Sequence, residues 1–224
     1  MFNSQLATRL SRQIHRYRQR GTIKNYLANH VVRKLQLGSG LNPLPGWLNT
    51  DLEPSEEMVL LDVRLPFPFG DFSFDYVFSE HSIEHVSYQH GLNCLKECFR
   101  VLRQGGKIRI ATPNLSFLIA LYNEDKTDCQ RRYVAWSMET FASPFEVPPE
   151  TYVINNFVRD WGHQFIYDYR TLYGALVQAG FVDVHEVRVG ESDDPVFQGL
   201  ESHGRVIPPE FNELETMVAE GRKP

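Results

Sequence analysis

The sequence predicts an α/β fold, a doubly wound and mostly parallel sheet of seven strands, and three observations support this prediction. Short apolar segments alternate with segments of helical periodicity, as in consecutive βαβ units. Several apolar segments end in glycine or in an acidic residue, as expected where strands reach the ligand-binding edge of a sheet. A composition of 42% hydrophobic and 23% charged residues fits one globular domain.

The expected elements follow in order along residues 33–224. An apolar face at three- and four-residue steps predicts a helix over 91–104, closed by Gly105 and Gly106. A second helix is expected over 168–180, with Asp168 as its N-cap and Gly180 just past its end. Apolar runs predict strands over 33–38, 46–51, 57–62, 72–80, 106–114, 181–189 and 213–223.

Residues 1–32 form a basic extension that we expect to be helical. Residues 1–50 carry eight Lys and Arg and no acidic residue. Gly21 is expected to break a first helix and to precede a short second one over 23–32. The basic face has three interpretations: a solvated cover of the core, contact of residues 1–30 with an anionic membrane surface or partner, or a transit peptide. The first helix is predicted from Phe2, Leu6, Leu10, Ile14 and Tyr17.

Residues 115–160 depart from the strand–helix rhythm, and they predict a mostly helical insertion after the fifth strand. An insertion at the carboxyl end of a strand is well placed to cover a ligand. Its polar and aromatic side chains can bind a sugar or an anionic sugar nucleotide, or they can form a packed cap. These side chains are Arg131, Arg132, Trp136, Tyr152, Asn155, Asn156, Arg159 and Trp161.

Composition also bears on compartment and partners. The chain has only three cysteines, which indicates a reducing, cytoplasmic environment and no disulfide framework. Cys94 and Cys98 stand four residues apart, and we expect both to pack in the core. No apolar run approaches a membrane span, and no secretory signal is visible. Residues 51–224 hold all 28 acidic residues, so nucleic acid is not an expected partner.

Residues 81–85 read HSIEH, which fits the H-x-x-E-H pattern of one class of zinc peptidases. In that interpretation His81 and His85 bind zinc and Glu84 serves as the general base. A peptidase requires the pattern inside a long helix and a further ligand from another helix. Here it directly follows an apolar strand. A zinc hydrolase is therefore a minor alternative, and the principal prediction includes no metal site.

Glycine and acidic residues mark the ends of the first three strands. Gly38-Ser39-Gly40 follows the first strand, where glycine lets the backbone approach a ligand closely. Asp51 and Asp62 end the second and third strands, so they can accept from ribose hydroxyls and from an adenine amino group. Both can also be turn or cap residues. NAD is not favoured, because Asp51 follows Gly40 by only 11 residues.

The order of these motifs resembles that of class I S-adenosylmethionine-dependent methyltransferases. The similarity is strongest to the small bacterial methyltransferase-11-type proteins associated with surface-polysaccharide genes. It lies in KLQLGSG, WLNTDL, LLDVRLPFPFGDFSFDYVFSEHSIEHV and LKECFRVLRQGGKIRIATPN, covers residues 33–114 and continues more loosely to about 190. Two departures are Gln104, where the family usually has proline, and the short link 41–46.

The resemblance implies a Rossmann-like fold that binds S-adenosylmethionine and releases S-adenosylhomocysteine. By that resemblance the Asp51 carboxylate holds the ribose, and Asp62 and the Val63 backbone hold the adenine. Glu80 and His81 are then expected beside the methionine end, and HSIEH is the family's strand-four motif. The implied cofactor-binding set is Gly38, Ser39, Gly40, Asp51, Asp62, Val63 and Glu80.

Methyl transfer to a hydroxyl requires a proton acceptor, and histidine suits that task. We expect His81 and His163 to be the catalytic residues, with a hydrogen-bonded loop histidine as the alternative for each. His85 is expected to close the loop after strand four. The predicted acceptor is a small molecule, and family association points to a sugar or glycan precursor. A protein that binds S-adenosylmethionine without catalysis is the second hypothesis.

Overall fold

The computed structural model describes residues 19–141 and 149–224. Within them seven strands form one sheet in the order β3-β2-β1-β4-β5-β7-β6. The first five strands in the sequence run parallel to one another, and β7 is antiparallel to both β5 and β6. The predicted mostly parallel, Rossmann-like sheet is confirmed. The strands are β1 (Lys34–Leu37), β2 (Leu48–Asp51), β3 (Val59–Leu60), β4 (Phe74–Glu80), β5 (Leu102–Pro113), β6 (Val182–Val187) and β7 (Thr216–Arg222).

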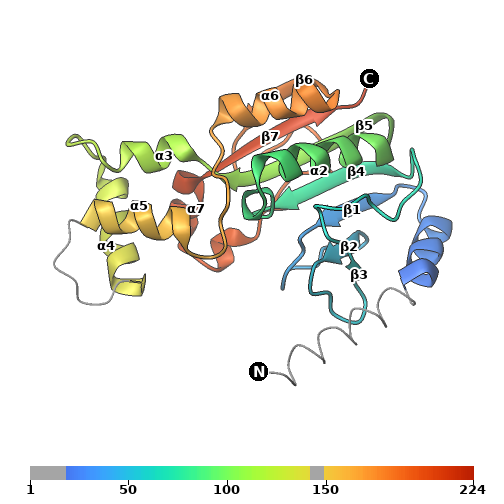
Figure 1. Ribbon diagram of the computed structural model, residues 1–224, viewed down its shortest axis with the longest axis horizontal. Helices are drawn as coiled ribbons and strands as arrows, with labels where there is room; N and C mark the ends of the chain where they lie inside the picture. Colours follow the sequence, from blue (N-terminus) through green and yellow to red (C-terminus); the bar gives the residue numbers. More distant parts are fainter. Residues whose placement is uncertain (1–18, 142–148) are drawn as a thin grey trace.

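Helices α2 and α6 pack on one face of this sheet, and a second group of helices lies beyond its edge. Figure 1 shows α3, α4, α5 and α7 gathered at one end of the molecule, toward which the arrowheads of β4 and β5 point. After a helix over residues 19–29, the described helical segments are η1 (Ile83–His85), α2 (Tyr88–Val101), α3 (Leu115–Ala120), α4 (Asp128–Phe141), α5 (Pro149–Arg159), α6 (Tyr169–Ala179), η2 (His203–Arg205) and α7 (Pro209–Glu215).

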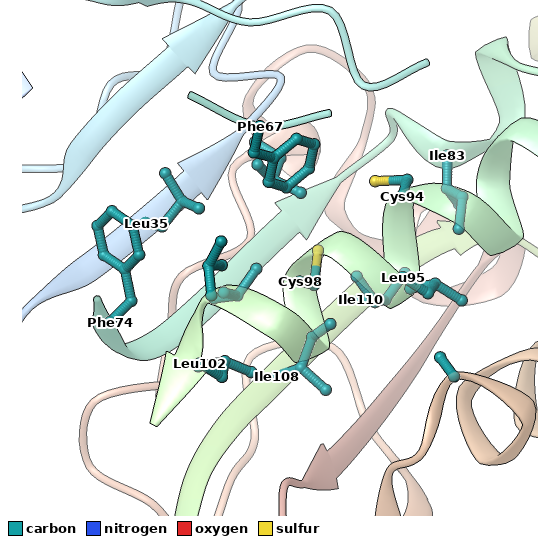
Figure 2. Packing of buried hydrophobic residues seen from close by; sticks show 14 of the residues in the cluster. Leu35, Phe67, Phe74, Ile83, Cys94, Leu95, Cys98, Leu102, Ile108 and Ile110 are labelled. Atoms are coloured by element: carbon teal, nitrogen blue, oxygen red, sulfur yellow. The ribbon is translucent and has the colours of Figure 1, made fainter. Parts of the chain in front are cut away.

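The main core lies between the sheet and helices α2 and α6. Figure 2 shows Cys94, Leu95 and Cys98 of α2 among apolar side chains that include Ile108 and Ile110 of β5. Both cysteines are buried and form no disulfide. The prediction that they pack in the core is confirmed.

The opposite face of β4 and β5 is covered by the segment 188–203. Phe78 of β4 packs with Trp47 and Phe197 in a small apolar cluster. Next to it Arg109 of β5 is completely buried, and its guanidinium binds the carboxylates of Glu201 and Glu220. These contacts attach to the sheet a segment that has almost no regular structure of its own.

The ends of helix α6 match the sequence prediction. Asp168 accepts a hydrogen bond from the Thr171 amide at 2.8 Å, as an N-cap should. Gly180 ends the helix with φ of 110°. An added Cβ there would lie 2.9 Å from the Phe99 ring, so both conformation and space require glycine.

Three predicted boundaries are wrong. Helix α2 ends at Val101, because Leu102 is extended and pairs with Phe74, so Gly105 and Gly106 lie inside β5. Residues 213–215 close α7 instead of opening the seventh strand. Residues 19–29 form a continuous helix through Gly21, which packs on the core through Ile23 and Tyr26.

The segment predicted as an insertion contains α3, α4 and α5, which share a second apolar cluster with α7. The amphipathic helix predicted over residues 2–17 lies outside the described residues. In the part of the chain that the structure describes, no helix has the length and apolarity needed to cross a bilayer.

Candidate active site

The carboxyl ends of β1, β2 and β3 border a cavity of about 690 Å³, here called the sheet-edge cavity. This volume lies within the roughly 300–1,000 Å³ typical of small-molecule sites. Five of the seven residues predicted to bind a cofactor line it. Its walls include Gly38, Gly40, Asp51, Asp62, Val63, His81, Ser82, His85 and Trp161.

The loop Gly38-Ser39-Gly40 borders this cavity through its two glycines. Gly38 and Gly40 have φ of 61° and 50°, which favours glycine at both. A Cβ on Gly38 would lie 2.6 Å from the Ser82 hydroxyl, so a side chain there would collide with the wall. Ser39 is buried and its hydroxyl pairs with the Thr50 backbone. Ser39 therefore shapes the loop and does not line the cavity.

Asp51 links the glycine loop to the segment after β2. Its two carboxylate oxygens accept from the amides of Gly40 and Glu53, each at 2.8 Å. Each oxygen retains a further lone pair for a ligand. Asp62 is paired with Arg64 through two side-chain hydrogen bonds of 2.8 and 2.6 Å. A ligand at Asp62 would share that carboxylate with the guanidinium.

The structure does not bring Glu80 to the sheet-edge cavity. Its carboxylate accepts from the amides of Ser202 and His203, both at 2.9 Å, and from the Ser202 hydroxyl at 3.0 Å. Glu80 lies on the same face of β4 as Tyr76 and Phe78, two residues that pack in the cluster around Phe197. Its prediction as a cofactor contact is wrong, because its carboxylate holds the segment before η2.

The HSIEH stretch forms a tight connection between β4 and α2. His81 has φ of 45°, and Ile83–His85 make a single 3-10 turn before Ser87 caps α2. The pattern therefore does not lie on the long helix that a zinc peptidase requires. Glu84 points inward and is completely buried, whereas His85 is partly exposed on the cavity wall.

A second cavity of about 250 Å³ lies next to the first, between α4, the segment after α5 and η2. We call it the aromatic cavity. Its wall is largely aromatic, with titratable groups on one side. It is lined by His81, Pro113, Tyr133, Trp136, Phe141, Phe157, Trp161, His163, His203, Val206, Ile207 and Glu215.

His81 and Trp161 line both cavities. Both are non-glycine residues with positive φ, at 45° and 56°. Such backbone conformations are costly and cluster at functional sites. The two cavities therefore meet at residues whose backbone is held in an unusual conformation.

The His81 ring is fixed on three sides. Its Nδ1 lies 3.4 Å from Oε1 of Glu84, its Nε2 lies 3.0 Å from the Thr216 hydroxyl, and the ring stacks on His203 with centroids 4.0 Å apart. Burial alone would lower the pKa of His81. The hydrogen bond and charge of Glu84, with the charges of Glu215 and Glu80, outweigh burial and raise this pKa.

His163 lies at the rim of the aromatic cavity. Its Nδ1 donates to the Phe157 carbonyl at 2.6 Å, and its ring is tilted against that of His85 with centroids 5.0 Å apart. Burial lowers the pKa of His163, which favours the neutral ring. His81 and His163 thus face one cavity, as the sequence predicted.

Three polar residues of the aromatic cavity, Tyr133, His203 and Glu215, were not predicted from the sequence. Glu215 accepts from the Tyr133 hydroxyl at 2.7 Å and lies 3.3 Å from Nε2 of His203. Glu215 ends α7 and His203 opens η2, so neither follows a recognisable motif. A polar residue within an apolar helical repeat could have marked a buried functional group. Tyr133 does not form such a pattern, so the sequence did not single it out.

Most of the polar side chains proposed to bind a sugar are occupied elsewhere. Arg131 and Arg132 pair with Asp128 and Glu210 on the surface. Of the predicted set only Trp136 and Trp161 line the aromatic cavity. Tyr152 donates to the Phe141 carbonyl and Asn155 to the Thr151 carbonyl, which are packing contacts.

The sequence between the glycine loop and β5 matches a known family. A family model described as a methyltransferase domain matches residues 40–110, which include Asp51, Asp62 and HSIEH. The strand order and the two adjacent cavities are consistent with this family match. Residues 40–110 therefore carry a methyltransferase domain, and the sheet around them has the fold of the class I S-adenosylmethionine-dependent methyltransferases. Among curated proteins, none matches it significantly by sequence.

Solved structures share the methyltransferase fold at low identity. An S-adenosylmethionine-dependent methyltransferase of Mesorhizobium loti is 13% identical with a TM-score of 0.53, over 86% of this chain and 91% of that one. A possible histamine N-methyltransferase of Thermotoga maritima is 15% identical with a TM-score of 0.50, over 98% and 97%. A Haemonchus contortus phosphoethanolamine N-methyltransferase 2 is 14% identical over 93% of this chain, which spans 53% of its length, with a TM-score of 0.47.

The sheet-edge cavity fits the cofactor of these methyltransferases. Its size suits a nucleoside with an amino-acid tail. Its loop has positive φ at both glycines, and its carboxylates follow β2 and β3 in the order that ribose and adenine require. Acidic residues and backbone groups are also the expected partners of hydroxyls and an amino group.

Proposed function

We propose that this methyltransferase transfers a methyl group to a small acceptor held in the aromatic cavity, with the cofactor in the sheet-edge cavity. The observation that carries the proposal is the junction of the two cavities at His81 and Trp161. Group transfer requires donor and acceptor in line and close together, away from water. Two adjacent cavities with a shared wall satisfy that requirement.

In the sheet-edge cavity, Asp51 would accept from the ribose hydroxyls and Asp62 from the adenine amino group. Gly38 and Gly40 would let the backbone approach the amino-acid tail. When bound, S-adenosylmethionine supplies a methyl group on a positively charged sulfur. Its sulfonium end would lie toward His81, because His81 lines both cavities.

His81 is the proposed proton acceptor for a hydroxyl or amine of the acceptor. Its ring is oriented by Glu84 on one side and by Thr216 on the other. The Glu84 carboxylate beside Nδ1 would stabilise the protonated ring, and Nε2, once it leaves the Thr216 hydroxyl, would take the proton. His163 lies across the same cavity and is the second proposed residue.

The acceptor is proposed to be small and to carry a ring or another apolar face. A cavity of about 250 Å³ lies below the usual range for drug-sized ligands, and Trp136, Phe141 and Trp161 supply flat apolar walls. A sugar ring can stack on such walls, so a sugar or glycan precursor stays within the proposal. The occupied arginines argue against a strongly anionic sugar nucleotide.

This function can be tested by measuring S-adenosylhomocysteine formation with each member of a panel of monosaccharides, phenols and small amines. We expect turnover with at least one class. His81→Ala should lose turnover while it keeps S-adenosylhomocysteine affinity, and Trp161→Ala should raise KM. Cofactor binding without turnover on any class would favour the non-catalytic alternative. Unchanged turnover in His81→Ala would remove His81 from the mechanism.

A further inference from the structure

We propose that Glu84, His85 and His163 bind a divalent ion of the zinc type between the two cavities. One ligand atom from each of these residues lies within 4.8 Å of the others. Two of the residues belong to the η1 turn, and the third follows α5, on a segment distant in sequence. The cluster therefore joins the two walls of the site.

Glu84 supplies the strongest argument. Its side chain has no exposed surface, and its Oε1 has no hydrogen-bond partner among the residues that the structure describes. The other oxygen accepts from the Thr112 hydroxyl at 3.1 Å, which fixes the orientation of the carboxylate. A buried carboxylate is costly unless a cation or donors surround it. The ring nitrogens nearest Oε1 are Nδ1 of His81 at 3.4 Å and Nε2 of His85 at 3.9 Å, and an ion at Oε1 would add a short bond where these contacts are long.

The two histidines present suitable nitrogens. His163 donates through Nδ1 to the Phe157 carbonyl, so the neutral ring carries its lone pair on Nε2. Such a bond to a backbone carbonyl is the usual outer contact of a metal-bound histidine. His85 places Nε2 at 3.9 Å from Oε1 of Glu84.

The ligand types select the ion. Two imidazoles and one carboxylate suit zinc or a similar transition metal, whereas magnesium and calcium prefer oxygen ligands. With bonds of about 2.0–2.2 Å, tetrahedral ligands lie about 3.3–3.6 Å apart. The His85–Glu84 separation of 3.9 Å therefore needs only a small contraction.

Three protein ligands leave one position open, as in catalytic zinc sites. His85 lines the sheet-edge cavity and His163 lines the aromatic cavity. The open position would take water or an oxygen of the acceptor, whose pKa the ion would lower. That role rests on the proposed function, whereas binding of the ion does not.

This site differs from the peptidase interpretation of HSIEH. There, His81 and His85 are ligands and Glu84 is a base. In the site proposed from the structure, Glu84 is a ligand because the 3-10 turn directs its carboxylate inward. His163 is a ligand in that site, and His81 is not.

A second cluster, His81, His203 and Glu215, is less suited to an ion. Two of its rings are stacked with an interplanar angle of 25°, so their lone pairs run side by side instead of converging. Its carboxylate already accepts from Tyr133. His203 is therefore the matched control for His163.

The test is titration of the full, chelator-stripped chain with zinc chloride by calorimetry, and with cobalt(II) by visible absorption. We expect one ion per chain and a tetrahedral cobalt spectrum. His163→Ala, His85→Ala and Glu84→Gln should each weaken zinc binding at least tenfold, and His203→Ala should not. His85 has a side chain 40% exposed, so His85→Ala serves as the variant with least risk to folding.

Circular dichroism melting of each variant verifies that it is folded. Zinc binding by folded His163→Ala and His85→Ala equal to that of the wild type would overturn the proposal. Loss of binding in His203→Ala alone would do the same, by placing the ion at the second cluster. A wild-type chain that binds S-adenosylhomocysteine but no zinc would disprove the metal site and leave the proposed function standing.

Discussion

Arg109→Met should destabilise the protein by about 3–5 kcal/mol, because it leaves buried charge unpaired. The Arg109 side chain is 0% exposed, and those of its partners Glu201 and Glu220 are 1% and 8% exposed. Its Nε donates to Glu201 at 2.5 Å. Methionine keeps most of the volume, so the loss reports the two carboxylates that remain without their guanidinium.

Urea denaturation at pH 7, followed by circular dichroism, measures this loss as a lower midpoint at similar slope. The control is Arg222→Met, whose partner is Asp183 on the surface, with side chains 42% and 67% exposed. An exposed pair contributes up to about 1 kcal/mol. If Arg109→Met cost no more than Arg222→Met, the argument that this buried cluster holds the segment 188–203 on the sheet would be wrong.

Further predictions concern a glycine pair and an ion pair. Gly91→Ala should cost about 1–3 kcal/mol in chemical denaturation, since its Cβ would lie 2.3 Å from the Tyr167 hydroxyl. A Cβ added at Gly174 would have no atom within 4 Å, so Gly174→Ala should instead stabilise helix α6 by about 0.5–1 kcal/mol. If both substitutions changed the free energy of unfolding in the same direction, this reasoning would be wrong. The hydrogen bonds of Arg100 lower the pKa of Glu97, so that pair stabilises the fold above the ordinary carboxylate pKa and loses its effect as pH falls through the lowered value. Glu97→Gln should therefore reduce the melting temperature at pH 7 and have no effect at low pH, and an equal reduction at both would refute the linkage.

Local signals account for the parts of the fold that were predicted correctly. Asp168 and Gly180 delimit α6 because capping and left-handed backbone depend on single residues. The strand ends at Asp51 and Glu80 follow from apolar runs. The end of α2 was missed because Leu102 can continue a helix, and its pairing with Phe74 is a tertiary interaction.

The sequence pointed to residues of the cavity wall where one motif places one residue at a strand end, as with Asp51 and His81. It did not do so where distant segments meet. His203 and Glu215 join the aromatic cavity through η2 and α7, which no local pattern links to β4. Glu80 was misplaced for the same reason, since its partners Ser202 and His203 lie 122 and 123 residues away.

The most direct test of the account is calorimetric titration of the wild type and Asp51→Ala with S-adenosylhomocysteine, with the exposed Asp125→Ala as control. We predict micromolar binding, about −8 kcal/mol. Loss of charge-assisted hydrogen bonds at Asp51 should weaken binding by about 1.5–3 kcal/mol, roughly 10- to 150-fold. Asp125→Ala should bind like the wild type. No binding by the folded wild type, or equal binding by Asp51→Ala, would contradict the assignment of the sheet-edge cavity to the cofactor.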